Sequence, residues 1–395
     1  MTTKNWQAEI TDELLQFATE TQAAKLVAIR ECGTVKAAAE SLGINERIIY
    51  RALKTVKDRA ARQGYSPAHD MRVTVPDGFH LRGTSTLYGD DGAQKLQWVK
   101  TSIDRERQAE MMREMIEAMA DDLPRLPVSS FHGTVHSDLL AVYPIGDAHI
   151  GMLAWGEESG DDWDLKIAEE TLCGAFRRCV DAAPHCEQAL IVNLGDWYHT
   201  ETMDGVTARS GYHLDTDGRY AKMVRIGVKI IRSMIDAALM RHASVRVINV
   251  QGNHDQTAAL MLSVCLSNIY ENEPRVSIDA SPSFFNYHEF GRVLIGAHHG
   301  HTCKADKLGG VMAADMPEAW GRTKHRYWLT GHIHHDSMKE YPGCTVESFC
   351  TLAAKDAYAS AGGWRSRRNT KCIVMHREHG EIERHTIDIS QLAIK

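Results

Sequence analysis

The sequence lacks the marks of several large protein classes. No apolar run approaches the roughly 18 continuous residues that a membrane-spanning helix needs. The nine cysteines are odd in number and include no Cys-x-x-Cys pair, which favours reduced thiols over a disulfide framework. The N-terminal residues include acids where a signal peptide would be apolar, and neither an internal repeat nor a low-complexity tract occurs. These absences predict a cytoplasmic globular protein with no membrane partner.

Composition and length narrow the predicted class of protein further. Apolar residues make up 43% and charged residues 25%, as in an ordinary globular chain, and 395 residues predict about two domains. The net charge of -7 does not indicate a nucleic-acid binder. Histidine is abundant, with 21 residues, and such abundance calls for an explanation such as metal binding.

The charge is unevenly spread. Residues 25–65 carry nine Lys or Arg against four Asp or Glu, and their apolar residues recur at helical spacing up to a boundary at Gly64–Pro67. Strand-like runs then flank Gly89–Gly92, which predicts a hairpin. A helix over 104–120 and a proline-containing linker over 121–130 follow. We therefore expect an all-α domain (1–66), a hairpin-helix connector (67–130) and a larger domain (131–395).

The larger domain alternates between strand and helix patterns. Short apolar runs stand at residues 139–145, 189–194, 245–250, 293–297 and 327–330, with helical stretches near 164–183, 217–241 and 257–270. This alternation predicts an α/β domain with a layered sheet.

Each apolar run ends in a short polar motif. The motifs are Asp147-Ala148-His149, Gly195-Asp196, Gly252-Asn253-His254-Asp255, His299-Gly300-His301 and Gly331-His332-Ile333-His334. Residues beyond the carboxyl ends of strands in α/β sheets converge on one crevice, so we expect these side chains to meet. Oxygen and imidazole donors without a thiolate suit manganese, iron or zinc rather than a structural cysteine-zinc site. Any one motif is weak, but five in this order form a strong signal.

In this order of motifs the chain resembles the calcineurin-like metallophosphoesterase family over about residues 137–390. The resemblance implies a four-layer α/β/β/α sandwich and a centre of two divalent metal ions that hydrolyses phosphoesters by hydroxide attack. We expect manganese, with iron, zinc or magnesium as alternatives. The layout is similar to the SbcD-type repair-nuclease branch, although no coiled-coil tail for an ATPase partner is evident.

The resemblance also implies roles for individual residues. One metal would be held by Asp147, His149, Asp196 and His334, and the other by Asp196, Asn253, His299 and His332. Asp196 would bridge the two ions, and His254 would be the catalytic histidine near the leaving group.

The chain departs from the family pattern after Asp196. Many relatives carry Asp three residues on, where this chain has His199, and the protein phosphatases carry Gly-Asn-His-Glu where this chain has Asp255. A phosphoprotein substrate is therefore disfavoured. We expect His199, Asp255 and His301 to orient the metal ligands without binding the metal themselves. For His199, a polar residue at the surface is an equal alternative.

Residues 34–54 resemble the helix-turn-helix of bacterial and phage proteins. Ala38 and Ala39 would allow close packing, Gly43 would form the turn and Asn45 would cap the second helix. The outer face of that helix would offer DNA contacts from Arg47, Tyr50, Arg51 and Lys54. The alternative is a three-helix bundle used for oligomerisation.

A second basic cluster includes Arg365, Arg367 and Arg368 and would line a path for a phosphate backbone, with a solvated surface as the alternative. Two tryptophans close to ligands in the sequence, Trp155 and Trp197, would either stack a base or pack in the core, and packing is the commoner role.

Three functions compete on these grounds. The first is a metal-dependent phosphodiesterase acting on DNA, a nuclease targeted by the helix-turn-helix, in a pairing of modules that resembles bacteriophage or prophage proteins and implies the bacterial host cytoplasm. The second is a small-molecule phosphoesterase, for cyclic nucleotides or phosphomonoesters, whose N-terminal bundle serves assembly into a homo-oligomer. The third is a non-catalytic DNA-binding regulator, which the unbroken ligand set disfavours.

Overall fold

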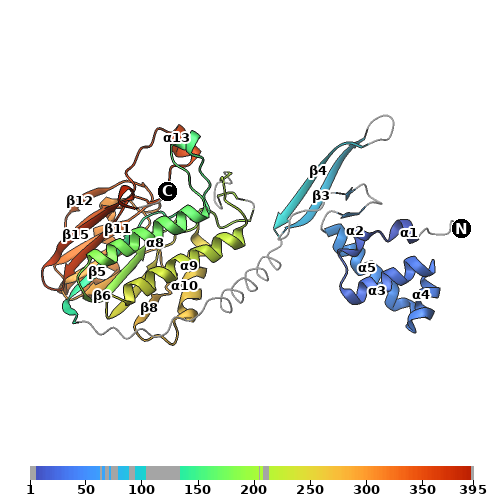
Figure 1. Cartoon of the computed structure of the whole chain (residues 1–395), viewed down its shortest axis with the longest axis horizontal. Coiled ribbons are helices and arrows are strands. Elements are labelled where there is room, and N and C mark those ends of the chain that lie inside the picture. The colour runs from blue at the N-terminus through green and yellow to red at the C-terminus, as the bar shows by residue number, and fades with distance from the viewer. Residues whose placement is uncertain are drawn as a thin grey trace. The chain divides into compact units, whose positions relative to one another are not determined.

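The computed structural model describes residues 6–62, 65–66, 71–72, 79–88, 94–103, 134–203, 205–207 and 213–392. The chain divides into two compact units, Met1–Glu117 and Ala118–Lys395 (Figure 1). The expected helix over 104–120 and linker over 121–130 lie outside the described residues, and the three-part division of the chain stays a prediction. No helix in the described ranges is long and apolar enough to cross a membrane.

The first unit begins with helices around one apolar core. They are α1 (Trp6–Glu9), α2 (Asp12–Leu15), α3 (Glu20–Cys32), α4 (Val35–Leu42) and α5 (Glu46–Arg62). Gly43 ends α4 in the left-handed conformation with φ of 64°, and Asn45 Oδ1 accepts from the backbone N–H of Arg47, 2.9 Å away, at the start of α5. Ala38 and Ala39 are buried between these helices, as the sequence predicted, and Ile49 is buried with them.

Strands follow the helices in this unit. The short pair β1 (Tyr65–Ser66) and β2 (Met71–Arg72) precedes the hairpin of β3 (Phe79–Tyr88) and β4 (Gln94–Ile103). The two antiparallel strands of the expected hairpin are confirmed, and its turn lies outside the described residues.

Two β-sheets form the second unit. The first has the order β15-β14-β5-β6-β7-β8 and the second the order β12-β13-β11-β10-β9. The first sheet contains β5 (His136–Ile145), β6 (Cys186–Asn193), β7 (Ser244–Asn249), β8 (Val276–Asp279), β14 (Asn369–His376) and β15 (Gly380–Asp388). The second contains β9 (Asn286–Phe290), β10 (Val293–His298), β11 (His325–Thr330), β12 (Ser337–Tyr341) and β13 (Cys344–Ser348). The five apolar runs are thus strands, but they divide between two sheets.

Helices cover the outer face of each sheet. Against the first sheet lie α8 (Leu165–Ala182), α9 (Tyr220–Leu239) and α10 (Gln256–Ile269). Against the second lie α11 (Ala305–Asp315) and α12 (Pro317–Arg322), through a cluster that includes Leu308, Met312 and Trp328. Three short helices, α7 (Gly156–Ser159), α13 (Ala357–Ala361) and the 3-10 turn η2 (Ile389–Gln391), complete the unit.

The apolar core lies between the two sheets. Leu190, Val192 and Ile248 of the first sheet pack in one cluster with Ile295 and Leu329 of the second. β10 is buried along its whole length, because a strand covered on both faces needs apolar side chains at every position. The layers therefore run α/β/β/α, as expected.

Candidate metal centre

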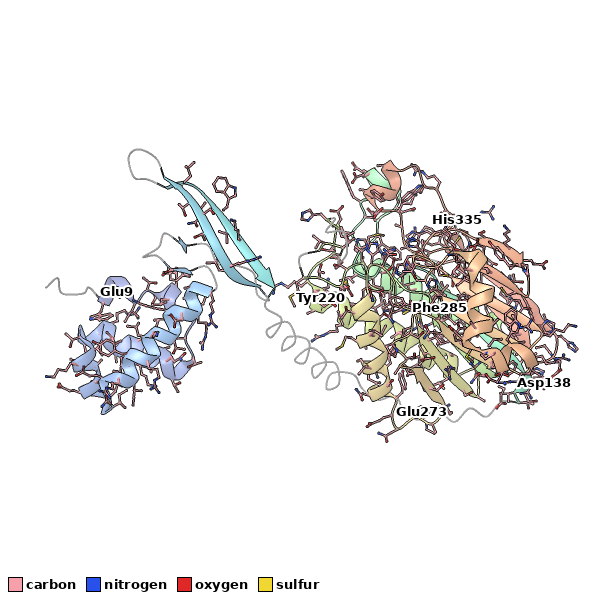
Figure 2. The ribbon with its side chains drawn as sticks, turned by 180° about the vertical axis from the view of Figure 1, so that it is seen from behind. Glu9, Asp138, Tyr220, Glu273, Phe285 and His335 are labelled. Atoms are coloured by element: carbon pink, nitrogen blue, oxygen red, sulfur yellow. The ribbon has the colours of Figure 1, made fainter. Side chains whose placement is uncertain are left out.

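The expected ligand residues lie at the carboxyl ends of β5, β6, β7, β10 and β11. Figure 2 labels Asp138, near the start of β5, and His335, just beyond the ligand loop that follows β11, at separate places on this unit. Parallel strands place their carboxyl ends at one edge, and the packing of two sheets brings two such edges together.

The backbone is strained at the site. Among the described residues, the non-glycine residues with positive φ are Asp147 (36°), His149 (43°), Asp196 (51°), His332 (70°) and His334 (56°). Each of these five was an expected ligand. A left-handed backbone costs conformational free energy for residues other than glycine, and it persists only where the surrounding structure enforces it. Such residues cluster at functional sites.

The first group of facing side chains is Asp147, His149 and His334. The Nε2 atoms of the two histidines are 3.3 Å apart, and His334 Nε2 is 3.4 Å from Asp147 Oδ1. The Asp147 carboxylate is held by the backbone N–H of His332, 3.0 Å from each oxygen, and Thr351 donates its hydroxyl to the Asp147 carbonyl at 2.6 Å. A strand-end carboxylate is thereby aimed at two imidazoles.

The second group is Asp196, His299 and His332, with Asn253 beside it. His299 donates its Nδ1 proton to the carbonyl of Leu194 at 2.8 Å, which turns its Nε2 toward two acceptors. These are Asn253 Oδ1 at 3.0 Å and Asp196 Oδ2 at 3.2 Å. Acceptor atoms that converge in this way suit a cation.

The pKa values at this group reflect the same convergence. Burial raises the pKa of Asp196, but the neighbouring imidazole of His299 outweighs it and holds that pKa well below its usual value. Burial also lowers the pKa of His299, whereas the carboxylates of Asp196 and Asp147 raise it to about 10. A site that favours an added proton so strongly also favours a metal cation in its place.

Asp255 joins the loops that carry the ligands. Its carboxylate accepts from the backbone N–H groups of Asp196, Tyr198 and Gly252 at 3.1 to 3.2 Å. Burial, and then the charge of Asp196, raises the Asp255 pKa to about 7. Gly252 is required beside it, because a Cβ there would lie 2.0 Å from Asp196 Oδ1.

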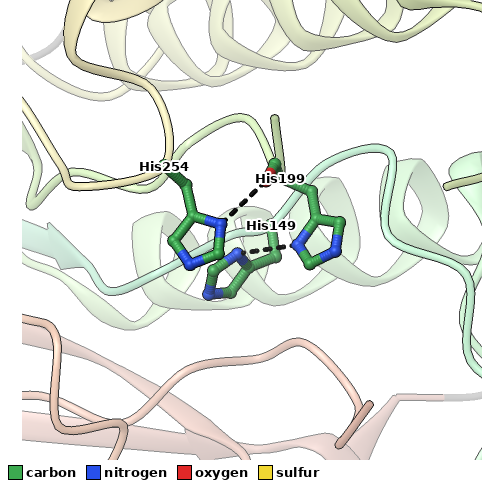
Figure 3. A group of neighbouring side chains, drawn as sticks. All are labelled: His149, His199 and His254. Atoms are coloured by element: carbon green, nitrogen blue, oxygen red, sulfur yellow. Dashed lines mark hydrogen bonds between the residues drawn. The ribbon is translucent and has the colours of Figure 1, made fainter. Parts of the chain in front are cut away.

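A third group of imidazoles adjoins the first (Figure 3). His199 Nδ1 is 3.2 Å from His149 Nδ1, and His254 donates its Nδ1 proton to the carbonyl of His199 at 2.9 Å. The rings of His199 and His254 are stacked with centroids 5.5 Å apart. His199 is buried, and burial together with the neighbouring His254 lowers its pKa to about 3.

The ligand residues differ in their exposure to solvent. Asp147, His149, Asp196 and His299 are buried, Asn253, His254 and His334 are half-buried, and His332 is exposed. His301 lies beside the second group, its ring centroid 5.1 Å from that of His299 and 6.1 Å from that of His332. A substrate can therefore reach the facing donors from solvent.

The expected DNA contacts fall into two sets. Arg47, Tyr50, Arg51 and Lys54 are exposed along one stripe of α5. In the second unit Arg365 and Arg367 are exposed, whereas Arg368 pairs with Asp161 at 3.4 Å, donates to the Leu352 carbonyl and lies over the ring of Trp163. Arg368 thus stabilises the fold.

Of the two tryptophans, Trp197 is buried and Trp155 is exposed.

Two supports of the site were missed by reasoning from the sequence. Thr351 holds Asp147 from a strand end more than 200 residues away, which no local motif reveals. Asp336 anchors the loop that carries His332 and His334, because it accepts from Lys371 Nζ, Asn369 Nδ2 and the backbone N–H of Cys350. Its place two residues after His334 was an available signal.

Comparison with known proteins finds distant structural likenesses alone. No family model and no curated protein matches it. Solved structures that resemble it include a predicted phosphoesterase of Streptococcus pneumoniae TIGR4 (12% identity, 64% of this chain and 99% of that one, TM-score 0.26). Another is Vps29 of Entamoeba histolytica in complex with zinc (12% identity, 63% of this chain and 99% of that one, TM-score 0.28). These likenesses are distant, so the residues of the site indicate the chemistry.

Proposed function

We propose that the chain is a metal-dependent phosphodiesterase that acts on DNA, as a nuclease, and is targeted by the exposed face of α5. The convergence of two groups of carboxylate and imidazole donors at five strand ends carries this proposal. The donor set fits two divalent cations. Asp147, His149 and His334 would hold one, Asn253, His299 and His332 would hold the other, and Asp196 would serve both.

Divalent ions in such a site supply Lewis acidity and lower the pKa of water, as phosphoester hydrolysis requires. The protein contributes the orientation of the donors and a proton carrier. Because a carbonyl holds the Nδ1 proton of His254, its Nε2 is the nitrogen free to bind or deliver a proton. The Asp196 carboxylate accepts from the His254 backbone N–H at 2.8 Å, which ties this histidine to the proposed ligands.

The test of the activity is an assay with added Mn²⁺. Linear, nicked and single-stranded DNA are compared with bis-p-nitrophenyl phosphate and cyclic AMP. Hydrolysis of DNA and of the nitrophenyl diester supports the proposal. Hydrolysis of the small esters alone would identify a small-molecule phosphoesterase, and no hydrolysis of any substrate would favour a DNA-binding regulator.

We expect His199 to determine the tautomer of His149. If His149 donates its Nδ1 proton to His199 Nδ1, its Nε2 lone pair faces His334 and the proposed metal. His199→Leu removes the acceptor and should weaken Mn²⁺ binding about 10- to 100-fold, whereas His199→Asn keeps an acceptor oxygen and should retain most of the affinity. Calorimetric titration with Mn²⁺ measures both variants, and wild-type affinity in the His199→Leu variant would refute this role.

We expect the face of α5 to contact duplex DNA. Lys57 pairs with Glu9 at 2.7 Å and Arg59 donates to the Phe17 carbonyl, so these two basic residues bind their own unit, unlike the exposed stripe. Arg47→Ala plus Arg51→Ala should weaken duplex binding and reduce the salt slope by about two. Fluorescence anisotropy across a salt series measures both quantities.

The matched control for charge is Arg177→Ala plus Arg178→Ala, two exposed positions on α8 of the other unit. This control should leave duplex binding unchanged. An unaltered salt slope in the α5 variant would remove the assignment of this face to DNA.

A further inference from the structure

Three aromatic side chains of the second unit are unusually exposed. Trp155 is 60% exposed, Tyr358 73% and Trp364 58%. Among the residues described in this unit, no other Trp, Tyr or Phe is more than half exposed. Large aromatic rings in water are costly and mark binding surfaces when they gather in one place.

The three aromatic residues lie in or next to two neighbouring short helices. Trp155 precedes α7, Tyr358 lies in α13, and Ser360 of α13 donates its hydroxyl to the Glu158 carbonyl of α7 at 3.2 Å. In Figure 1 α7 is the short green helix beside α13. The rings of Tyr358 and Trp364 meet edge to face with centroids 5.4 Å apart. We call Trp155, Tyr358 and Trp364 the aromatic surface.

Short chain segments connect the aromatic surface to the candidate metal centre. Trp155 follows His149 by six residues, and Tyr358 follows Thr351 by seven. Thr351 itself is bonded to the Asp147 carbonyl at 2.6 Å. Seven residues span at most about 25 Å, a distance that a few nucleotides cover.

Charge around the aromatic surface has two signs. Arg365 and Arg367 are exposed next to Trp364, and Arg365 donates to the carbonyls of Ser360 and Trp364, which neutralise none of its charge. Glu157 and Glu158 are exposed on α7. A duplex lying across this surface would bring a phosphate backbone to the acids, whereas one strand can place its backbone along the arginines and its bases on the rings.

We propose that the aromatic surface is a stacking site for the unpaired bases of single-stranded DNA leading into the metal centre. This inference rests on the proposed function for the identity of the substrate. The DNA that reaches the metal centre would then be a single strand or the single-stranded end of a duplex. Base stacking on aromatic rings tolerates any sequence, so the site would select for strandedness and not for sequence.

The experiment measures binding of a fluorescent 15-nucleotide single strand to the full chain in EDTA, so that no cleavage occurs. Arg47→Ala plus Arg51→Ala is the common background, which removes the proposed contacts of α5. Tyr358→Ala plus Trp364→Ala should weaken binding about 5- to 100-fold, and Tyr358→Phe plus Trp364→Phe should restore it. Met240→Ala, which removes a side chain that is 72% exposed after α9, is the matched control and should have no effect.

An abasic strand of the same length separates stacking from charge. Wild type should bind it weakly, and the double alanine variant should bind it no more weakly than wild type does. Unchanged binding of the normal strand by the alanine variant, or an equal loss on the abasic strand, would overturn the stacking site.

Turnover of bis-p-nitrophenyl phosphate with Mn²⁺ is measured on the same variants and should be unchanged, because this small diester does not need the aromatic surface. If wild type did not hydrolyse this diester, the proposed phosphodiesterase activity would be refuted. The binding comparison would still show whether the aromatic surface stacks bases.

Discussion

Asp196→Asn is expected to lower metal-dependent turnover of bis-p-nitrophenyl phosphate by at least about 1,000-fold. Metal ions supply several kcal/mol of transition-state stabilisation, and each 1.36 kcal/mol is a factor of ten in rate. Asp196 lies 3.2 Å from His299 and is the proposed shared ligand of both ions. Asparagine keeps the size and one oxygen, which can still accept from the backbone N–H of His254, but it removes the charge that holds two cations close together.

The measurements are kcat at saturating Mn²⁺ and the stoichiometry of bound metal. Thermal unfolding of the metal-free protein should show that the fold is retained. Asp236→Asn, at a carboxylate of α9 that accepts from the Tyr270 hydroxyl, is the matched control and should keep wild-type turnover. Wild-type rates in the Asp196 variant would show that the metal centre is assigned to the wrong residues.

His254→Ala is expected to lower the turnover of DNA about 100- to 10,000-fold while Mn²⁺ affinity is retained. Its Nδ1 is held by the His199 carbonyl at 2.9 Å, so its Nε2 would serve the leaving oxygen. A deoxyribose alkoxide needs a proton to leave, whereas p-nitrophenolate is a far weaker base. The loss should therefore be much smaller with bis-p-nitrophenyl phosphate than with DNA.

This difference between substrates distinguishes proton transfer from a structural role. A purely structural histidine would lower both rates by the same factor. A metal ligand would lower Mn²⁺ affinity, which calorimetric titration measures directly. Either result would contradict the assignment of His254. The matched control is His325, a half-buried residue at the start of β11 whose Nε2 lies 3.1 Å from the Glu378 carbonyl. His325→Ala should alter neither rate nor affinity.

Much of the fold was accessible from the sequence because its signals are local. Apolar runs such as 189–194 predict buried strands, and the helical spacing over 164–183 predicts α8, which the structure has at Leu165–Ala182. Gly43 and Asn45 mark the turn between α4 and α5 by their backbone preferences. The division of the five strands between two sheets came only with the resemblance, since strand pairing joins residues far apart in the chain.

The sequence by itself determined which residue types follow each strand, and hence that oxygen and imidazole donors would meet at one edge of the fold. The tertiary structure decided which of them face one another. The direction of each imidazole depends on partners such as the Leu194 carbonyl for His299, 105 residues away, and these partners are set by packing. It also decided that Arg368 serves the fold and that Trp155 lies in solvent, because burial depends on what the rest of the chain brings to cover a side chain.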